Sequence, residues 1–221
     1  MKVSVGLLTY NRQHLLKTTL ASIRNTHIPF WLTVMDNGSD DEAATKKVSR
    51  NTIPDRTTYL RTAGIPVGTA WNTMTNVIRD TQKPDLFVLS ADDYAYKAAW
   101  LGRLISAWDA APDNCAIISC NWEPEYPWNS ITSREKWGGQ EVLVRATVPG
   151  SHWTFRHNML EKIFPLLEKT GGEDLEALRR LSAQGYIFGA LDLTEHIGEK
   201  ESSWGNQSWK QAKPLKLEEA T

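Results

Sequence analysis

Two adjacent aspartates, Asp92 and Asp93, follow the apolar run Leu86 to Leu89 and the pair Ser90-Ala91. The run has the length and composition of a buried strand, so both carboxylates are expected where that strand ends. Neighbouring carboxylates repel each other and raise each other's pKa. A divalent metal that also binds a diphosphate would turn this repulsion into a ligand set. A polar turn after a strand is the other interpretation of the pair taken alone.

The first half of the chain alternates short apolar runs with amphipathic stretches. This alternation is typical of parallel strands joined by crossover helices. It predicts strands at 3–8, 31–35, 57–60 and 86–89, and helices at 12–24, 41–50 and 68–80, with Asn11 capping the first helix. Later segments predict helices at 98–111, 156–168 and 173–184, and strands at 116–120, 142–148 and 187–191.

Residues 121–140 show neither helical nor strand periodicity and contain Trp122, Trp128 and Trp137. We expect a long irregular loop here, and such a loop inside a compact domain is usually functional. Cys115 and Cys120 are five residues apart in a predicted strand, so we expect free core thiols on opposite faces.

Charge and composition exclude some functions. The net charge is -1, from 25 basic and 26 acidic side chains, which gives no case for tight, sequence-independent binding to duplex nucleic acid. The apolar stretch at the N-terminus is too short for a signal peptide or a membrane span. We therefore expect a soluble cytoplasmic protein.

Polar residues follow each predicted strand of the first half. Ligands of an open parallel sheet bind at the carboxyl ends of its strands, so these segments are expected to face one site. Each segment taken singly is also ordinary turn chemistry. The segments are Thr9 to Arg12, Asp36 to Asp41, Arg61 to Gly64, and Asp92-Asp93.

In this order the segments resemble family 2 glycosyltransferases with the GT-A nucleotide-diphospho-sugar transferase fold, over about residues 3–200. The resemblance implies an α/β fold of GT-A type, with a mainly parallel central sheet, helices on both faces and a small acceptor-side subregion. It implies a single domain at 1–205, with a nucleotide-binding half at about 1–95 and an acceptor-binding half at about 96–205. A C-terminal tail would follow at 206–221.

The implied activity is that of a metal-dependent inverting glycosyltransferase, which moves a sugar from a nucleoside diphosphate, UDP by resemblance, to an acceptor hydroxyl. Asp174 would be the catalytic base; a cap on the helix it precedes is the alternative for Asp174 and Glu173. Asp93 and His196 would bind Mn²⁺ or Mg²⁺. The implied nucleotide-sugar residues are Thr9, Tyr10, Arg12, Asp36, Asn37, Arg61 and Asp92, and the implied acceptor residues are Glu173, His152 and Trp153.

One departure from the family pattern leaves alternatives open. Many members carry an acidic residue two places before the aspartate that binds the metal, and here that position is Ser90 or Ala91. Which member of the acid pair binds metal therefore stays open, and a catalytically inactive carbohydrate- or nucleotide-sugar-binding module is the alternative function. The acceptor is open as well: a glycan precursor, a protein, or a modified nucleobase of phage DNA. Nucleic acid enters as a partner only in that role.

Overall fold

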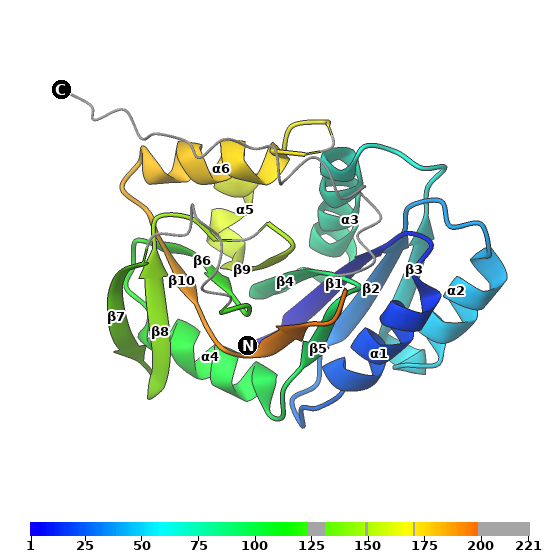
Figure 1. The fold of residues 1–221 in the computed structure, drawn as a ribbon, viewed down its shortest axis with the longest axis horizontal. Helices are drawn as coiled ribbons and strands as arrows, with labels where there is room; N and C mark the ends of the chain where they lie inside the picture. Colours follow the sequence, from blue (N-terminus) through cyan, green and yellow to red (C-terminus); the bar gives the residue numbers. More distant parts are fainter. Residues whose placement is uncertain (123–130, 149, 170, 199–221) are drawn as a thin grey trace.

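The computed structural model describes residues 1–122, 131–148, 150–169 and 171–198 (Figure 1). The strands are β1 Val3–Thr9, β2 Trp31–Asp36, β3 Thr57–Arg61, β4 Leu86–Ala91, β5 Tyr94–Tyr96, β6 Cys115–Ser119, β7 Ile131–Trp137, β8 Gln140–Arg145, β9 His152–Arg156, β10 Ile187–Ala190 and β11 Thr194–His196. The helices are α1 Gln13–Ile23, α2 Glu42–Arg50, α3 Val67–Gln82, α4 Trp100–Ala110, α5 Leu160–Ile163 and α6 Glu173–Ser182, with short 3-10 turns at Pro54–Arg56 and His157–Met159.

The centre of the molecule is a nine-stranded sheet with the order β3-β2-β1-β4-β9-β6-β10-β8-β7. Strands β3, β2, β1 and β4 are parallel neighbours, as the alternating pattern predicts. In the described sheet only β8 and β9 run against the other strands. A second, two-stranded sheet pairs β5 with β11. The predicted α/β class and mainly parallel sheet are confirmed.

Helices cover both faces of the large sheet (Figure 1). Alternate residues of a strand point to opposite faces, so Leu7 packs in the core cluster with α1 and α4, whereas Leu8 packs in the cluster with α3, α5 and α6. Strands buried on both faces need nearly continuous apolar runs, which explains the composition of β1 and β4. None of the helices in the described ranges is long and apolar enough to cross a bilayer.

The prediction of an irregular loop at 121–140 is wrong for its second part. Ile131–Trp137 is strand β7, which forms a hairpin with β8. The turn uses Gly138 and Gly139, both with positive φ, a dipeptide that favours tight hairpins. β7 lies at the sheet edge and carries alternating charges, so it lacks the apolar alternation of a half-buried strand. Trp137 is buried, and Trp128 lies outside the described residues.

The predicted helix at 156–168 is also wrong in extent. Its first residue ends β9, and only Leu160–Ile163 forms the helix α5. The segment His152–Arg156 instead pairs with β4 on one side and β6 on the other, both antiparallel. Three buried β-formers in this stretch, Trp153, Thr154 and Phe155, fit that central position.

Both cysteines are free and buried, as predicted, but they do not lie on opposite faces. Cys115 and Cys120 belong to the same core cluster. The pairing of β6 with β10 shifts register between Ile187 and Phe188, which inserts one extra residue into β6 and reverses the alternation.

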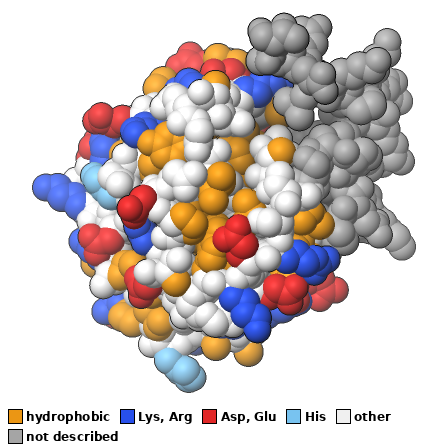
Figure 2. Space-filling model, turned by 90° about the vertical axis from the view of Figure 1, so that its left-hand side faces the viewer, with side chains coloured by type: hydrophobic (Ala, Val, Ile, Leu, Met, Phe, Trp, Pro, Cys, Tyr) orange, Lys and Arg blue, Asp and Glu red, His pale blue; other side chains and the backbone are white. Residues whose placement is uncertain are grey.

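Figure 2 shows the face at the β7 and β8 side of the molecule. Basic and acidic side chains are interspersed there around a band of hydrophobic ones. Between β7 and β8, Arg134 pairs with Glu141 at 3.1 Å. No patch of a single sign gathers on the described part of this face, which agrees with the near-zero net charge.

Candidate functional site

The order of the sheet reverses between β1 and β4. The chain leaves β1 toward β2 on one side, and β4 returns to pair on the other side. A crevice opens at the carboxyl ends of two strands where the order reverses, and ligands of open α/β sheets bind there. Thr9 ends β1, and its hydroxyl donates a 2.6 Å hydrogen bond to Asp92 Oδ2 just beyond β4. The fold thus joins two of the polar segments that the sequence singled out.

Within the described residues, Asp92 and Asp93 share the positive charge of Arg12. The Arg12 guanidinium forms an ion pair with Asp92 Oδ1 and a second pair, at 2.9 Å, between its Nη1 and Asp93 Oδ2. Only 10% of the Arg12 side chain is exposed, and Asp92 is fully buried. Sequence reasoning assigned Arg12 to the nucleotide sugar and did not foresee this contact.

Burial and charge move the pKa values of the two aspartates in opposite directions. Burial raises the pKa of Asp92 to about 6, although Arg12 and Thr9 oppose this shift. Burial also acts to raise the pKa of Asp93, but His196 and Arg12 together outweigh it and the net shift is downward. Asp93 is therefore the member of the pair that stays ionised more readily.

The loop between β1 and α1 aims Arg12 at the acid pair. Arg12 is the N-cap residue of α1, and the helix has no side-chain cap, so the prediction that Asn11 caps it is wrong. Asn11 instead has a positive φ of 53° and binds the turn after β2. Its Nδ2 donates to Asp40 Oδ2 at 3.0 Å, and the Asp40 amide donates to its Oδ1 at 2.8 Å. This clamp turns the chain so that the following arginine points back across the end of the sheet.

Asp36 ends β2 with its side chain fully buried. The Ser39 amide donates to Oδ1 at 2.8 Å, and the Tyr59 hydroxyl donates to Oδ2 at 2.7 Å. Arg61 Nη1 lies 3.3 Å from the same Oδ2. Burial, followed by the Asp36 contact, raises the pKa of Tyr59. Sequence reasoning missed Tyr59, although its position two residues before Arg61 on β3 places both on one face of the strand.

Asn37 holds the loop after β3. Its Nδ2 donates to the Ile65 carbonyl at 2.8 Å, while its Oδ1 accepts from the Thr62 hydroxyl at 2.6 Å and the Ile65 amide at 3.1 Å. These three contacts fix the wall of the crevice, and Asn37 also lines the cavity described next.

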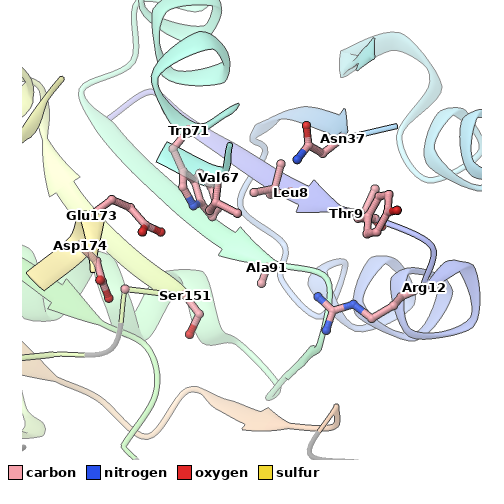
Figure 3. Close-up of a pocket in the computed structure, with 12 residues that line it drawn as sticks. Leu8, Thr9, Arg12, Asn37, Val67, Trp71, Ala91, Ser151, Glu173 and Asp174 are labelled. Carbon is pink, nitrogen blue, oxygen red and sulfur yellow. The ribbon is translucent and has the colours of Figure 1, made fainter. Parts of the chain in front are cut away.

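A cavity of about 190 Å³ extends from this edge toward α6 (Figure 3). Thr9 and Arg12 lie at one end, and Glu173 and Asp174 lie at the other. Its apolar wall consists of Leu8, Val67 and Trp71. Val67 and Trp71 are four residues apart at the start of α3, so they share one face of the helix. Sequence reasoning did not assign either of them to the site.

Glu173 and Asp174 begin α6, whose N-cap is Gly172 and which has no side-chain cap. Neither acid is the N-cap residue, but both lie in the first turn of α6, where a negative charge complements the helix dipole. Glu173 is only 8% exposed, and burial raises its pKa. Burial also raises the pKa of Asp174, against hydrogen bonds from backbone amides that include Leu175, at 2.8 Å, and Gly150. A Cβ at Gly150 would lie 2.1 Å from Asp174 Oδ2, so only glycine lets the two segments approach this closely.

His196 reaches the acid pair through the small second sheet. Its strand β11 pairs with β5, and the Ile197 amide donates to the Asp93 carbonyl at 2.8 Å. His196 Nε2 consequently lies 3.4 Å from Asp93 Oδ2. The structure thus brings together the two residues expected to bind metal.

The residues present fit a divalent cation only in part. Asp93 Oδ1 is buried and has no hydrogen-bond partner among the described residues, which suits an oxygen that awaits a ligand. A carboxylate with an imidazole is a donor set that Mn²⁺ accepts. Within the described ranges, however, no three His, Cys, Asp or Glu side chains gather closely enough to hold a metal. A cation here would need further ligands from a bound molecule.

His152 and Trp153 lie in β9. His152 is fully buried, its Nε2 lies 2.9 Å from the Tyr96 hydroxyl, and burial lowers its pKa to about 3. Trp153 is buried and lines a smaller cavity that also touches Glu173 and Asp174. The neighbour that sequence reasoning passed over, Ser151, lines the larger cavity and shares a 2.5 Å hydrogen bond with the Tyr94 hydroxyl.

Comparisons with known proteins identify the type of fold. The model of the family described as glycosyl transferase family 2 matches residues 4–169. The mannosyltransferase PcManGT from Pyrobaculum calidifontis, solved with GDP-Man and Mn²⁺, is similar with a TM-score of 0.66 at 18% identity, over 91% of this chain and 58% of that one. TarS 1-349 from S. aureus, solved with UDP-GlcNAc, is similar with a TM-score of 0.63 at 15% identity, over 90% and 61%.

A third structure, GalNAc-T7 with UDP, GalNAc and Mn²⁺, is similar with a TM-score of 0.67 at 12% identity, over 88% of this chain and 43% of that one. The chain therefore spans less than two thirds of the length of each of these structures. At such identities the likeness shows the fold alone, which is the GT-A fold. A search of curated proteins finds no match.

The raised pKa of Asp92 predicts a pH dependence of stability in metal-free buffer. The ordinary pKa of an aspartate is 3.8, and that of Asp92 in the folded protein is about 6. At pH values between these two, Asp92 holds a proton in the folded protein that it has lost in the unfolded chain. The contribution of Asp92 to the free energy of unfolding is therefore fully present below pH 4 and is lost as the pH rises through 6. Urea melts give the free energy of unfolding of the wild type and of Asp92→Asn. The wild-type value minus the variant value should fall by roughly 1–3 kcal/mol as the pH rises across that window. A difference that rises with pH would mean that the ion pair with Arg12 outweighs burial.

Proposed function

The chain belongs to glycosyl transferase family 2, and we propose that it is a metal-dependent inverting glycosyltransferase. It would move a sugar from a nucleoside diphosphate to an acceptor hydroxyl. The observation that carries this proposal is the single cavity that joins Thr9 and Arg12, beside the acid pair, to Glu173 and Asp174. One end has the hydroxyl and guanidinium groups that a nucleotide diphosphate needs. The other end has the carboxylates of the buried Glu173 and the half-buried Asp174, which can take a proton.

On the donor side, Asp36 would accept a hydrogen bond from the nucleotide base, and Asp92 would bind the ribose. Asp36 is already held by Ser39, Tyr59 and Arg61, but each carboxylate oxygen accepts more than one hydrogen bond. We propose UDP as the nucleotide by resemblance to the family, and the Asp36 carboxylate would accept a hydrogen bond from the imide N–H of uracil. TarS and GalNAc-T7 were solved with UDP-GlcNAc and with UDP, respectively, and PcManGT with GDP-Man.

We propose that Asp93 and His196 hold Mn²⁺ or Mg²⁺ together with oxygens of the diphosphate. Two of the similar structures contain Mn²⁺. A bound cation supplies positive charge where the leaving diphosphate gains negative charge. The backbone of Ile197 and the absence of a side chain at Gly198, where a Cβ would lie 2.6 Å from Asp93 Cβ, keep His196 close to Asp93.

Asp174 would act as the base of the transfer step. The acceptor oxygen forms a bond to the anomeric carbon while the bond from that carbon to the diphosphate oxygen breaks, and the electron pair leaves with the diphosphate. The hydroxyl proton passes to Asp174. Attack from the face opposite the leaving group inverts the configuration. Burial raises the pKa of Asp174, which makes it a stronger base than an exposed aspartate.

The proposed donor-binding and acceptor-binding residues come from different halves of the chain. Thr9 and Asp36, which end β1 and β2, and Asp92, which follows β4, belong to the predicted donor half at about 1–95. Ser151, Glu173 and Asp174 belong to the predicted acceptor half. Glu173, Ser151 and Trp153 would face the acceptor. The boundary at 205 and the tail at 206–221 lie outside the described residues.

Asp174→Asn should abolish transfer and leave donor binding intact, because the amide keeps the shape of the side chain but cannot take the proton. We expect UDP binding within about twofold of wild type and a fall in UDP release from UDP-sugar of about 10²- to 10⁴-fold. Glu176→Gln is the matched control, since Glu176 lies on the same helical turn and pairs with Arg180. Normal turnover by Asp174→Asn would show that Asp174 is not the base.

A wild type that binds UDP-sugars with Mn²⁺ but never releases UDP would favour the binding-module alternative.

Asp93→Asn should remove the effect of metal on nucleotide binding. Calorimetry of UDP with Mn²⁺ should show binding weakened by about 10- to 100-fold, while binding in EDTA stays as in the wild type. Asp85→Asn is the control, because the exposed Asp85 lies at the opposite end of β4 and binds the Lys2 amide. If Mn²⁺ strengthens UDP binding to Asp93→Asn as it does to the wild type, the metal ligand has been assigned to the wrong residue.

A further inference from the structure

The guanidinium of Arg12 is paired with the Asp93 oxygen that faces His196. Its Nη1 is 2.9 Å from Asp93 Oδ2, the same oxygen that lies 3.4 Å from His196 Nε2. Asp93 therefore presents to His196 an oxygen that an internal cation already holds. A divalent ion placed between Asp93 and His196 would stand within a few ångströms of that guanidinium, and like charges at such distances repel strongly in a buried setting.

Charge balance points in the same direction. Two carboxylates and one guanidinium leave the buried cluster one negative charge in excess when both aspartates are ionised. A divalent cation added to the cluster with Arg12 in place would leave one positive charge in excess. Metal therefore fits best when Arg12 gives up at least its contact with Asp93, or when a further anion enters with the metal.

Arg12 is also placed to receive such an anion. It lines the cavity beside Thr9 and Tyr10, so its exposed part faces the space assigned to the donor. Its Nε is buried without a hydrogen-bond partner in the described part of the chain. The planar guanidinium binds phosphate oxygens through two parallel hydrogen bonds. A diphosphate would thus offer Arg12 a partner to replace Asp93.

We propose that Arg12 is a resident counter-ion of the acid pair, which keeps divalent cations from Asp93 until a nucleoside diphosphate arrives and takes over the Arg12 salt bridge. This inference rests on the proposed function. Metal and donor would then bind cooperatively, each removing an obstacle for the other. Free Mn²⁺ would bind weakly, so the protein would load its metal together with its donor.

The second arginine at this edge provides a matched control. Arg61 has the same charge and also pairs with a buried aspartate, Asp36, at 3.3 Å. Its other contacts are to Glu42, at 3.5 Å, and to the Ser39 carbonyl, at 3.0 Å, so it touches neither member of the acid pair in the described contacts. Arg61→Gln removes one positive charge from the same edge without freeing Asp93.

The test measures Mn²⁺ binding by the electron paramagnetic resonance signal of the free ion, with and without UDP. For the wild type we expect weak binding of Mn²⁺ alone and binding strengthened about tenfold or more by UDP. Arg12→Gln should bind Mn²⁺ alone about tenfold more tightly than the wild type, and UDP should add little further. Arg61→Gln should bind Mn²⁺ alone within about twofold of the wild type.

Loss of Arg12 leaves a buried acid pair without its cation, which endangers folding. Arg12→Lys covers this case, because the single ammonium group keeps the charge but cannot pair with two carboxylates through a planar fork. It should bind Mn²⁺ alone with an affinity between those of the wild type and Arg12→Gln. Circular dichroism spectra of all variants check that the compared proteins are folded.

Three results would overturn the inference. The wild type binding Mn²⁺ alone as tightly as the Arg12 variants would refute it and leave the proposed function intact. Equal tightening in Arg12→Gln and Arg61→Gln would show a general effect of charge rather than release of Asp93. Absence of Mn²⁺ binding in every protein, with or without UDP, would remove the metal from the proposed function, and this inference would fall with it.

Discussion

Two adjacent carboxylates buried at the end of β4 must be neutralised, and the surrounding elements supply the groups that do so. An unpaired buried charge is strongly destabilising, so the pair needs a cation or protons in the folded state. Arg12 supplies the cation from the start of α1, and the Thr9 hydroxyl binds Asp92 from β1. The Thr19 hydroxyl donates to the Asp92 carbonyl at 2.7 Å, and the Ile197 amide donates to the Asp93 carbonyl. Elements from both ends of the chain therefore converge on these two residues.

The same constraint explains how a stable fold can also bind a charged ligand. The pair lies where the sheet order reverses, so its neighbours are two strand ends and the start of one helix rather than a closed core. β9 inserts antiparallel beside β4, and the segment before it carries Gly150 and Ser151 to the cavity. α6 then places Asp174 against Gly150. Acids of the second half thus face the donor end of the cavity, although they are distant in sequence.

Sequence patterns predicted the parallel half of the fold and the polar segments that follow its strands. They succeeded where burial on both faces produces apolar runs, as in β1 and β4, and where turn residues follow a strand. They failed at β7, whose charged edge positions conceal the strand period. They also failed at β9, where no strand was predicted and only Arg156 falls within the helix predicted at 156–168. They also missed Trp71 and Tyr59, because aromatic residues inside regular elements look like core. The partner of Arg12 was not predictable, since it depends on how the loop held by Asn11 turns.

A crystal structure with Mn²⁺ and UDP, with the ion located by its anomalous scattering, tests the central claim most directly. The account predicts an ion bonded to Asp93 and to His196 Nε2 as well as to the diphosphate. It also predicts that the Arg12 guanidinium has left Asp93 Oδ2 and pairs with a phosphate oxygen. An ion bound at Asp93 while Arg12 keeps its contact with the same oxygen, or an ion bound elsewhere, would contradict the account.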